Sequence, residues 1–107
     1  MSKTYIVREG TTGATSVTTS SAEELVEVHV TYYVDNTFAA EATPGAGTVA
    51  VVGTRKDGRT TTIGTLDATD PNEFVSAVGN FKSIAITPAG ITVAGAYEVT
   101  VVATDSY

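Results

Sequence analysis

The stretch Glu24–Asp35, ELVEVHVTYYVD, contains the longest clean alternation of apolar and polar side chains in this sequence. A β-strand places successive side chains on opposite faces of its sheet, so every second residue shares a face. One face carries Val26, Val28, Val30, Tyr32 and Val34, and the other carries Glu27, His29, Thr31, Tyr33 and Asp35. The pattern predicts a half-buried strand whose valines pack against a core.

The composition indicates that the rest of the chain is also built of strands. Threonine and valine together make up about a third of the 107 residues, leucine occurs only at Leu25 and Leu66, and tryptophan is absent. Branched side chains lose rotamer freedom in helices and pack well on a pleated sheet. Further short strands are expected near residues 48–55, 60–66, 80–87 and 97–104. This spacing is typical of an all-β, antiparallel β-sandwich, either Ig-like or jelly-roll-like.

The N-terminal segment is poor in large apolar side chains. Residues 3–8, KTYIVR, suit a short strand. In residues 9–21, EGTTGATSVTTSS, the only large apolar side chain is Val17. Such a segment cannot offset its own ordering cost by burial. We interpret residues 1–22 as an extended arm that lies along a neighbouring subunit, and residues 23–107 as the sandwich domain; a frayed terminus or an ordinary edge strand is the alternative. Removing residues 1–20 is then expected to abolish attachment and leave the domain folded.

Local patterns predict how the strands are connected. Asp57-Gly58 is typical of a tight hairpin turn, although a two-residue loop would place Lys56 opposite Arg59, so a longer loop is also open. Gly53 and Gly64 fall inside expected strands, which indicates bulges or close backbone approach.

Two patterns resemble helix starts. Ser21-Ala-Glu-Glu24 fits a capping box, which predicts one helical turn before the main strand. Asp70-Pro71-Asn72-Glu73 predicts another single turn, from which Phe74, Val75 and Val78 would plug one end of the core.

Charge and hydropathy argue against nucleic-acid and membrane partners. The formal net charge is -6, and the six basic residues are spread along the chain, whereas nucleic-acid binding needs a clustered basic surface. The longest aliphatic run, residues 49–52, is far short of the ~20 residues of a membrane span. The N-terminus lacks a signal-peptide core, so we expect synthesis in a cytoplasm. The absence of cysteine leaves the redox compartment open.

No constellation of residues specifies a reaction, so we expect no enzyme and no cofactor. His29 is the only histidine, and no nucleophile motif accompanies it. Asp67, Asp70, Asn72 and Glu73 place several oxygen ligands close together, but they lack the spacing of a calcium loop and suit capping roles. We therefore expect no metal site.

An interface is the more informative possibility. Tyr33 points away from the valine side of its strand, so either both faces of the sheet are covered or an aromatic side chain is presented to a partner. Together with the arm and the following loop, this gives the expected interface residues Tyr5, Ile6, Val7, Tyr33 and Phe38.

The second half of the chain resembles a known group of proteins. Residues 52–66, VGTRKDGRTTTIGTL, followed by NFKSIAITPAGIT and AYEVTVVAT, resemble small β-sandwich modules of tailed-bacteriophage virions. In those modules a hairpin with a D-G turn precedes a K-x-I-x-I-x-P strand and a terminal V-T-V-V strand. The resemblance implies a non-enzymatic role as a capsid decoration (cement) protein, a head fibre or a tail accessory.

We therefore expect a homo-oligomeric virion protein, taken as a trimer, that binds the major capsid protein or another virion protein on the outer shell. The alternative is a glycan- or receptor-binding module of a phage tail or surface appendage, with residues 36–47 and 67–72 as the contact loops.

Overall fold

Eight β-strands and their connections make up the computed structural model, which describes residues 2–19 and 23–105. These residues contain no helix, and so none that is long and apolar enough to cross a bilayer. The strands are β1 (Ser2–Glu9), β2 (Thr15–Thr18), β3 (Glu23–Tyr33), β4 (Thr48–Arg55), β5 (Thr60–Asp67), β6 (Phe74–Val78), β7 (Phe81–Ala89) and β8 (Ala96–Asp105).

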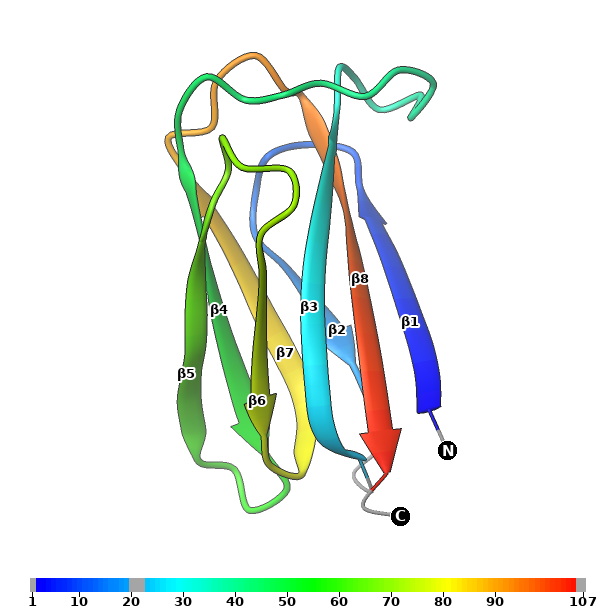
Figure 1. Ribbon diagram of the computed structural model, residues 1–107, viewed down its shortest axis with the longest axis vertical. Helices are drawn as coiled ribbons and strands as arrows, with labels where there is room; N and C mark the ends of the chain where they lie inside the picture. Colours follow the sequence, from blue (N-terminus) through cyan, green and yellow to red (C-terminus); the bar gives the residue numbers. More distant parts are fainter. Residues whose placement is uncertain (1, 20–22, 106–107) are drawn as a thin grey trace.

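The strands form two four-stranded sheets that pack face to face (Figure 1). The first sheet has the order β1-β8-β3-β6 and the second has the order β2-β7-β4-β5, with antiparallel pairing throughout. Strand β1 thus pairs with β8, β2 with β7, β3 with β6 and β4 with β5, as in one long hairpin wrapped into two layers. This nested order is that of a jelly roll, which confirms the expected antiparallel sandwich and selects between its two expected forms.

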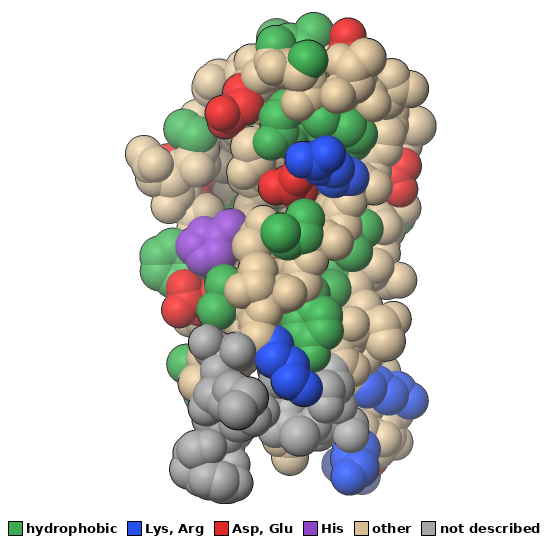
Figure 2. All heavy atoms as spheres, turned by 90° about the vertical axis from the view of Figure 1, so that its right-hand side faces the viewer, with side chains coloured by type: hydrophobic (Ala, Val, Ile, Leu, Met, Phe, Trp, Pro, Cys, Tyr) green, Lys and Arg blue, Asp and Glu red, His purple; other side chains and the backbone are tan. Residues whose placement is uncertain are grey.

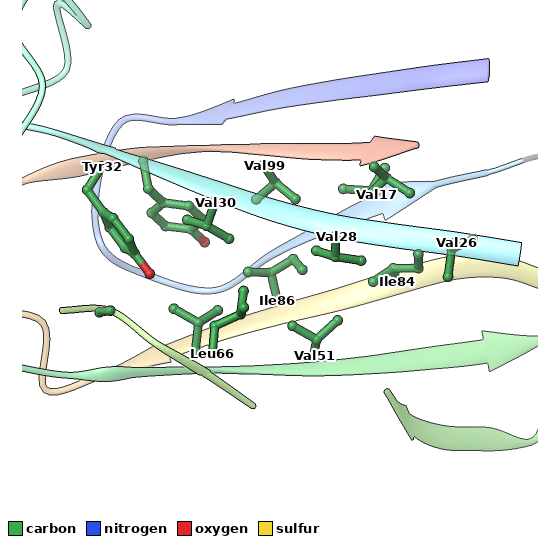
Figure 3. Close-up of a cluster of buried hydrophobic side chains, with 14 of the residues drawn as sticks. Val17, Val26, Val28, Val30, Tyr32, Val51, Leu66, Ile84, Ile86 and Val99 are labelled. Carbon is green, nitrogen blue, oxygen red and sulfur yellow. The ribbon is translucent and has the colours of Figure 1, made fainter. Parts of the chain in front are cut away.

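The core lies between the sheets and follows from the alternation in β3. Val26, Val28 and Val30 are buried, and Figure 3 shows them pointing from β3 toward Ile84 and Ile86 of β7. Burying one such side chain stabilises the fold by about 1.5–3 kcal/mol. The polar side of β3 therefore has to face outward, which fixes the outer surface of the first sheet.

Residues 2–19, expected to belong to an arm, supply two edge strands of the sandwich. Strand β1 pairs along its length with β8, and β2 pairs with β7. Val17 is only 1% exposed, and Tyr5 and Val7 pack against the core. The backbone bonds to β8 and β7, together with this burial, offset the ordering cost that the segment cannot offset alone. The alternative interpretation, an ordinary edge strand, therefore describes this segment.

The expected helix start at Asp70-Pro71 is instead a turn that leads directly into β6. The Glu73 N–H donates to the Asp70 carbonyl over 3.3 Å, and strand pairing with β3 begins at Phe74. Val75 packs against the core, whereas Val78 is exposed. The helical turn expected at residues 21–24 falls partly outside the described residues, and β3 begins at Glu23.

Both glycines inside strands serve the roles that the sequence indicates. A Cβ on Gly53 would lie 2.4 Å from the Phe81 ring, and a Cβ on Gly64 would lie 2.7 Å from Val75. The β4–β5 register also shifts next to Gly64, which marks a bulge. The hairpin loop spans residues 56–59 and has Gly58 at φ 91°, so the longer of the two expected loops is formed.

Candidate docking face

The outer face of the first sheet carries apolar, aromatic and charged side chains together. The strand registers place one set of side chains on it, and we call this set the docking face. Figure 2 shows apolar side chains beside charged side chains and the histidine along this side of the molecule. The docking face consists of Thr4, Ile6, Arg8, Leu25, Glu27, His29, Thr31, Tyr33, Phe74, Ser76, Val78, Glu98, Thr100 and Val102.

An apolar group occupies the β3–β6 edge of the docking face. Leu25 and Val78 are direct cross-strand partners, and so are His29 and Phe74. Leu25 is 38% exposed, Phe74 is 50% exposed and Val78 is 66% exposed. The His29 and Phe74 rings stack with centroids 5.1 Å apart, and His29 Nε2 lies 3.3 Å from Glu27 Oε1. Cross-strand packing thus organises these side chains without covering them.

A second group lies toward the other end of the docking face, around Arg8. Arg8 Nε donates a hydrogen bond to Glu98 Oε2 over 2.8 Å, and this bond holds the pKa of Arg8 above its ordinary value. The Arg8 guanidinium carbon lies 5.2 Å from the ring centre of Phe38, within the range of a cation–π contact. Phe38 in turn packs edge-on against Tyr33, with centroids 5.3 Å apart. Side chains from β1, β3, β8 and one loop therefore converge here.

A tight turn after β3 places Phe38 in this group. Asp35 Oδ1 accepts hydrogen bonds from the Thr37 hydroxyl (2.6 Å) and the Thr37 N–H (3.0 Å), and both bonds lower the pKa of Asp35. Phe38 then adopts φ 56°, in the left-handed region that side chains other than glycine rarely enter. The Asp35 turn and the ring contacts together hold this conformation.

The expected interface residues separate into two sets. Ile6, Tyr33 and Phe38 lie on the outer side of the first sheet, and Ile6 is 60% exposed. Tyr5 and Val7 point the other way and pack against the core. The sequence did not predict that Leu25, Phe74 and Val78 lie on this exposed face. The alternating pattern of FVSAV at residues 74–78 is the signal that would have found two of them, but the preceding Asp-Pro favoured a helix.

The residues weighed for catalysis or calcium binding have structural partners. His29 contacts Glu27 and Phe74, as described above. Asp67 Oδ1 accepts from the Thr69 N–H and hydroxyl at 3.0 and 2.8 Å, which lowers the pKa of Asp67. Asp70 Oδ1 accepts from the Asn72 N–H at 3.0 Å. Within residues 2–19 and 23–105, no group of three or more His, Cys, Asp or Glu side chains is arranged to hold a metal ion.

Comparison with protein families gives one match, a model described as "Domain of unknown function (DUF7265)", over residues 8–106. The chain belongs to the DUF7265 family. The matched range includes β2 and the last two residues of β1, so the edge strand β2 belongs to the family's domain. No curated protein matches this DUF7265 chain.

Solved structures share the fold of the DUF7265 chain at low sequence identity. The SPBc2 prophage-derived protein YomS has a TM-score of 0.60 and 9% identity, over 96% of this chain and 94% of that one. The PBSX exported protein XepA has a TM-score of 0.59 and 19% identity; the match covers 95% of this chain but 38% of XepA. The Yersinia pseudotuberculosis-derived mitogen has a TM-score of 0.52 and 8% identity, over 100% and 89%. These likenesses establish the fold.

Proposed function

We propose that this DUF7265 protein is a non-enzymatic structural protein of a phage virion, and specifically a capsid decoration protein that binds the outer shell. The observation that carries the proposal is the docking face. Ile6, Phe74 and Val78 are each at least half exposed on it, beside aromatic and charged side chains that contact one another. Apolar side chains gathered on one face of a well-packed domain mark a surface that binds another protein.

The fold supports this assignment. Jelly rolls are recurrent building blocks of viral capsid proteins. One of the structures with this fold, YomS, is described as a protein derived from the SPBc2 prophage, and another, XepA, is described as a PBSX exported protein. The fold depends on no disulfide, because the chain has no cysteine, so a change of redox environment on release from a cell leaves its covalent structure unaltered.

The docking face suits attachment to a repeating lattice. Its apolar edge supplies area to bury, while the Arg8–Glu98 pair and the Phe38 ring supply directional contacts at its other end. We assign the major capsid protein, or another virion protein, as the partner. A homo-oligomer, taken as a trimer, would present several docking faces at once, so a modest affinity at each face gives firm attachment overall.

The test begins with virions of the phage or prophage that encodes the protein. Mass spectrometry of purified particles should detect the protein at a copy number set by the capsid lattice. Phe74→Asp and Ile6→Asp, each added to particles lacking the protein, should greatly reduce occupancy because they put a charge into the apolar contact. Ala85→Asp is the matched control, since Ala85 is exposed on the outer face of the second sheet and should leave occupancy unchanged.

Absence of the protein from virions would refute the virion assignment. Wild-type occupancy of both docking-face variants would refute the assigned surface. Native mass spectrometry of the free protein tests the trimer separately, and a purely monomeric species would refute it.

A further inference from the structure

A small depression opens at the loop end of the sandwich, beside the last residues of β3. Its volume is about 120 Å³. Side chains of β3, of the loop after β3 and of the turn after β5 form its walls. The lining residues are Val30, Thr31, Tyr32, Glu41, Ala42, Thr43 and Pro71.

The depression exists because β3 changes its neighbour at this point. His29–Phe74 is the last pair between β3 and β6. The loop after β3 then takes the place of β6, because the Ala42 N–H donates to the Tyr32 carbonyl over 2.9 Å. Val30 and Thr31 fall between these two partners, and Pro71, from the turn after β5, also lines the depression. The gap therefore results from the topology and does not depend on one side-chain rotamer.

Tyr32 is the unusual member of the lining. Its side chain is 5% exposed, yet its hydroxyl makes no hydrogen bond with any of the described residues. Figure 3 shows the ring extending from β3 toward the opposite sheet with the hydroxyl at its far end. A buried hydroxyl without a partner costs about 1–3 kcal/mol, so such a group calls for a water or a ligand.

The other buried tyrosine in the core shows that this fold can satisfy a phenol. The Tyr97 hydroxyl donates to the Gly13 carbonyl over 2.6 Å. Among residues 2–19 and 23–105 Tyr32 has no such acceptor, although the Asp67 and Glu73 carboxylates are near enough to influence it. Burial, followed by those two charges, raises the pKa of Tyr32 to about 12. At neutral pH the Tyr32 hydroxyl therefore keeps its proton and is available as a donor.

The chemistry of the walls restricts what the depression would accept. Glu41 lies in the lining, and Asp67 and Glu73 lie near Tyr32, so the local charge is negative and disfavours phosphate or an acidic sugar. Val30, Ala42 and Pro71 offer apolar surface. A neutral sugar residue matches this combination, because its hydroxyls both donate and accept while its ring carries an apolar C–H face.

We propose that this depression binds one neutral sugar residue, whose hydroxyls accept from Tyr32 and donate to Glu41. The site lies at the loop end and shares one lining residue, Thr31, with the docking face. It adds a ligand site to the domain.

The test is an NMR titration of the full chain with glucose, galactose, mannose and N-acetylglucosamine. At least one sugar should give saturable shifts in the amides of residues 30–32 and 41–43. Tyr32→Phe removes only the hydroxyl and should weaken that binding about five- to tenfold, the equivalent of one neutral hydrogen bond. Tyr33→Phe is the matched control, because it removes a hydroxyl from the next residue on the opposite side of β3, and it should bind as the wild type does.

Folding of each variant is checked by its thermal midpoint. Because Tyr32→Phe deletes a buried hydroxyl that has no hydrogen-bond partner in the described part of the chain, its midpoint should equal or exceed that of the wild type. Glu41→Gln should also weaken binding, and N-acetylneuraminic acid should not bind. The proposal is overturned if none of the four sugars gives saturable shifts, or if Tyr32→Phe binds with wild-type affinity.

Discussion

At Gly53 the lack of a side chain allows the Phe81 ring to lie directly against the backbone of β4. A Cβ at this position would approach Phe81 Cδ1 to 2.4 Å and Ile63 Cδ1 to 3.1 Å. Phe81 is fully buried, so the ring has little room to move away. Gly53→Ala should therefore destabilise the fold by about 1–3 kcal/mol through overpacking. Urea denaturation followed by circular dichroism measures this change.

Gly45→Ala is the control for this substitution. Gly45 lies in an exposed loop, and an added Cβ would meet only the Thr92 hydroxyl, at 3.2 Å. Its stability should stay close to that of the wild type. Equal stability of the two alanine variants would show that Phe81 repacks freely, contrary to the geometry.

The two buried tyrosines give a second prediction at the residue scale, because within the described residues only the Tyr97 hydroxyl makes a hydrogen bond. Tyr97→Phe breaks the bond to the Gly13 carbonyl and should cost about 0.5–1.5 kcal/mol. Tyr32→Phe breaks no bond within the described residues and should cost nothing. Parallel thermal denaturation of the two variants measures the difference, and a larger loss for Tyr32→Phe would contradict the assigned hydrogen bonding.

Some residues of the docking face could be predicted from their type and position in the sequence. The alternation of side chains along a strand explains why other expected residues point toward the core instead. Ile6 and Tyr33 lie on the outer face of the first sheet, and their expected role at an interface stays a prediction. Tyr5 and Val7 were expected at the same interface as Ile6, but alternate residues of one strand point to opposite faces. A strand at residues 3–8 therefore already implied that Ile6 could not share a face with its two neighbours. The Phe38 contact depends on a loop conformation with positive φ, which no local pattern specified.

At the scale of elements, β1 and β2 should be required for folding. Strand β1 supplies one of the two neighbours of β8, β2 completes the second sheet beside β7, and Val17 is buried between the sheets. Deletion of residues 1–19 should therefore abolish the cooperative thermal transition, contrary to the expectation from an arm. The single substitution Val17→Ala is a milder test of β2 and should lower the free energy of unfolding by about 2 kcal/mol. Ser16→Ala, at the exposed neighbouring position, should change it very little. A truncated chain with a wild-type transition would contradict the assignment of these strands.

Strand positions were largely predictable, whereas strand partners were not. The alternation in β3 and the β-branched runs of β4 and β8 reflect local side-chain patterns, so their ranges follow closely from the sequence. The pairing of Val17 with Ile84 joins residues far apart in the chain. Composition, taken over residues 9–21 alone, contains no information on that pairing. Strand β6 was missed for a related reason, because its stability comes from β3 and from Val75 in the core.

At the scale of the whole molecule, the nested strand pairing determines where the chain ends, the depression and the docking face lie. Ser2 pairs with Thr104, so the described ends of the chain lie side by side at one end of the sandwich (Figure 1). The depression lies at the other end, next to the last residues of β3, and the docking face runs along one side. The two surfaces meet at Thr31, which belongs to the docking face and also lines the depression, so a partner that covers Thr31 should compete with a ligand at the loop end.

Alkaline pH should unfold the whole molecule through its two buried phenols. Burial is the main cause that raises the pKa of Tyr32 and of Tyr97 to about 12, from 10.0 in the unfolded chain. Well below pH 10.0 both groups are protonated in both states, so their contribution is fully present. As the pH rises toward 12, the unfolded chain releases protons that the folded chain retains, and stability falls by up to about 1.4 kcal/mol per tyrosine per pH unit. Thermal midpoints should therefore drop across this range together with the appearance of tyrosinate absorbance. The double variant Tyr32→Phe/Tyr97→Phe lacks both groups and should show a clearly shallower drop; an identical drop would assign the alkaline transition to other groups.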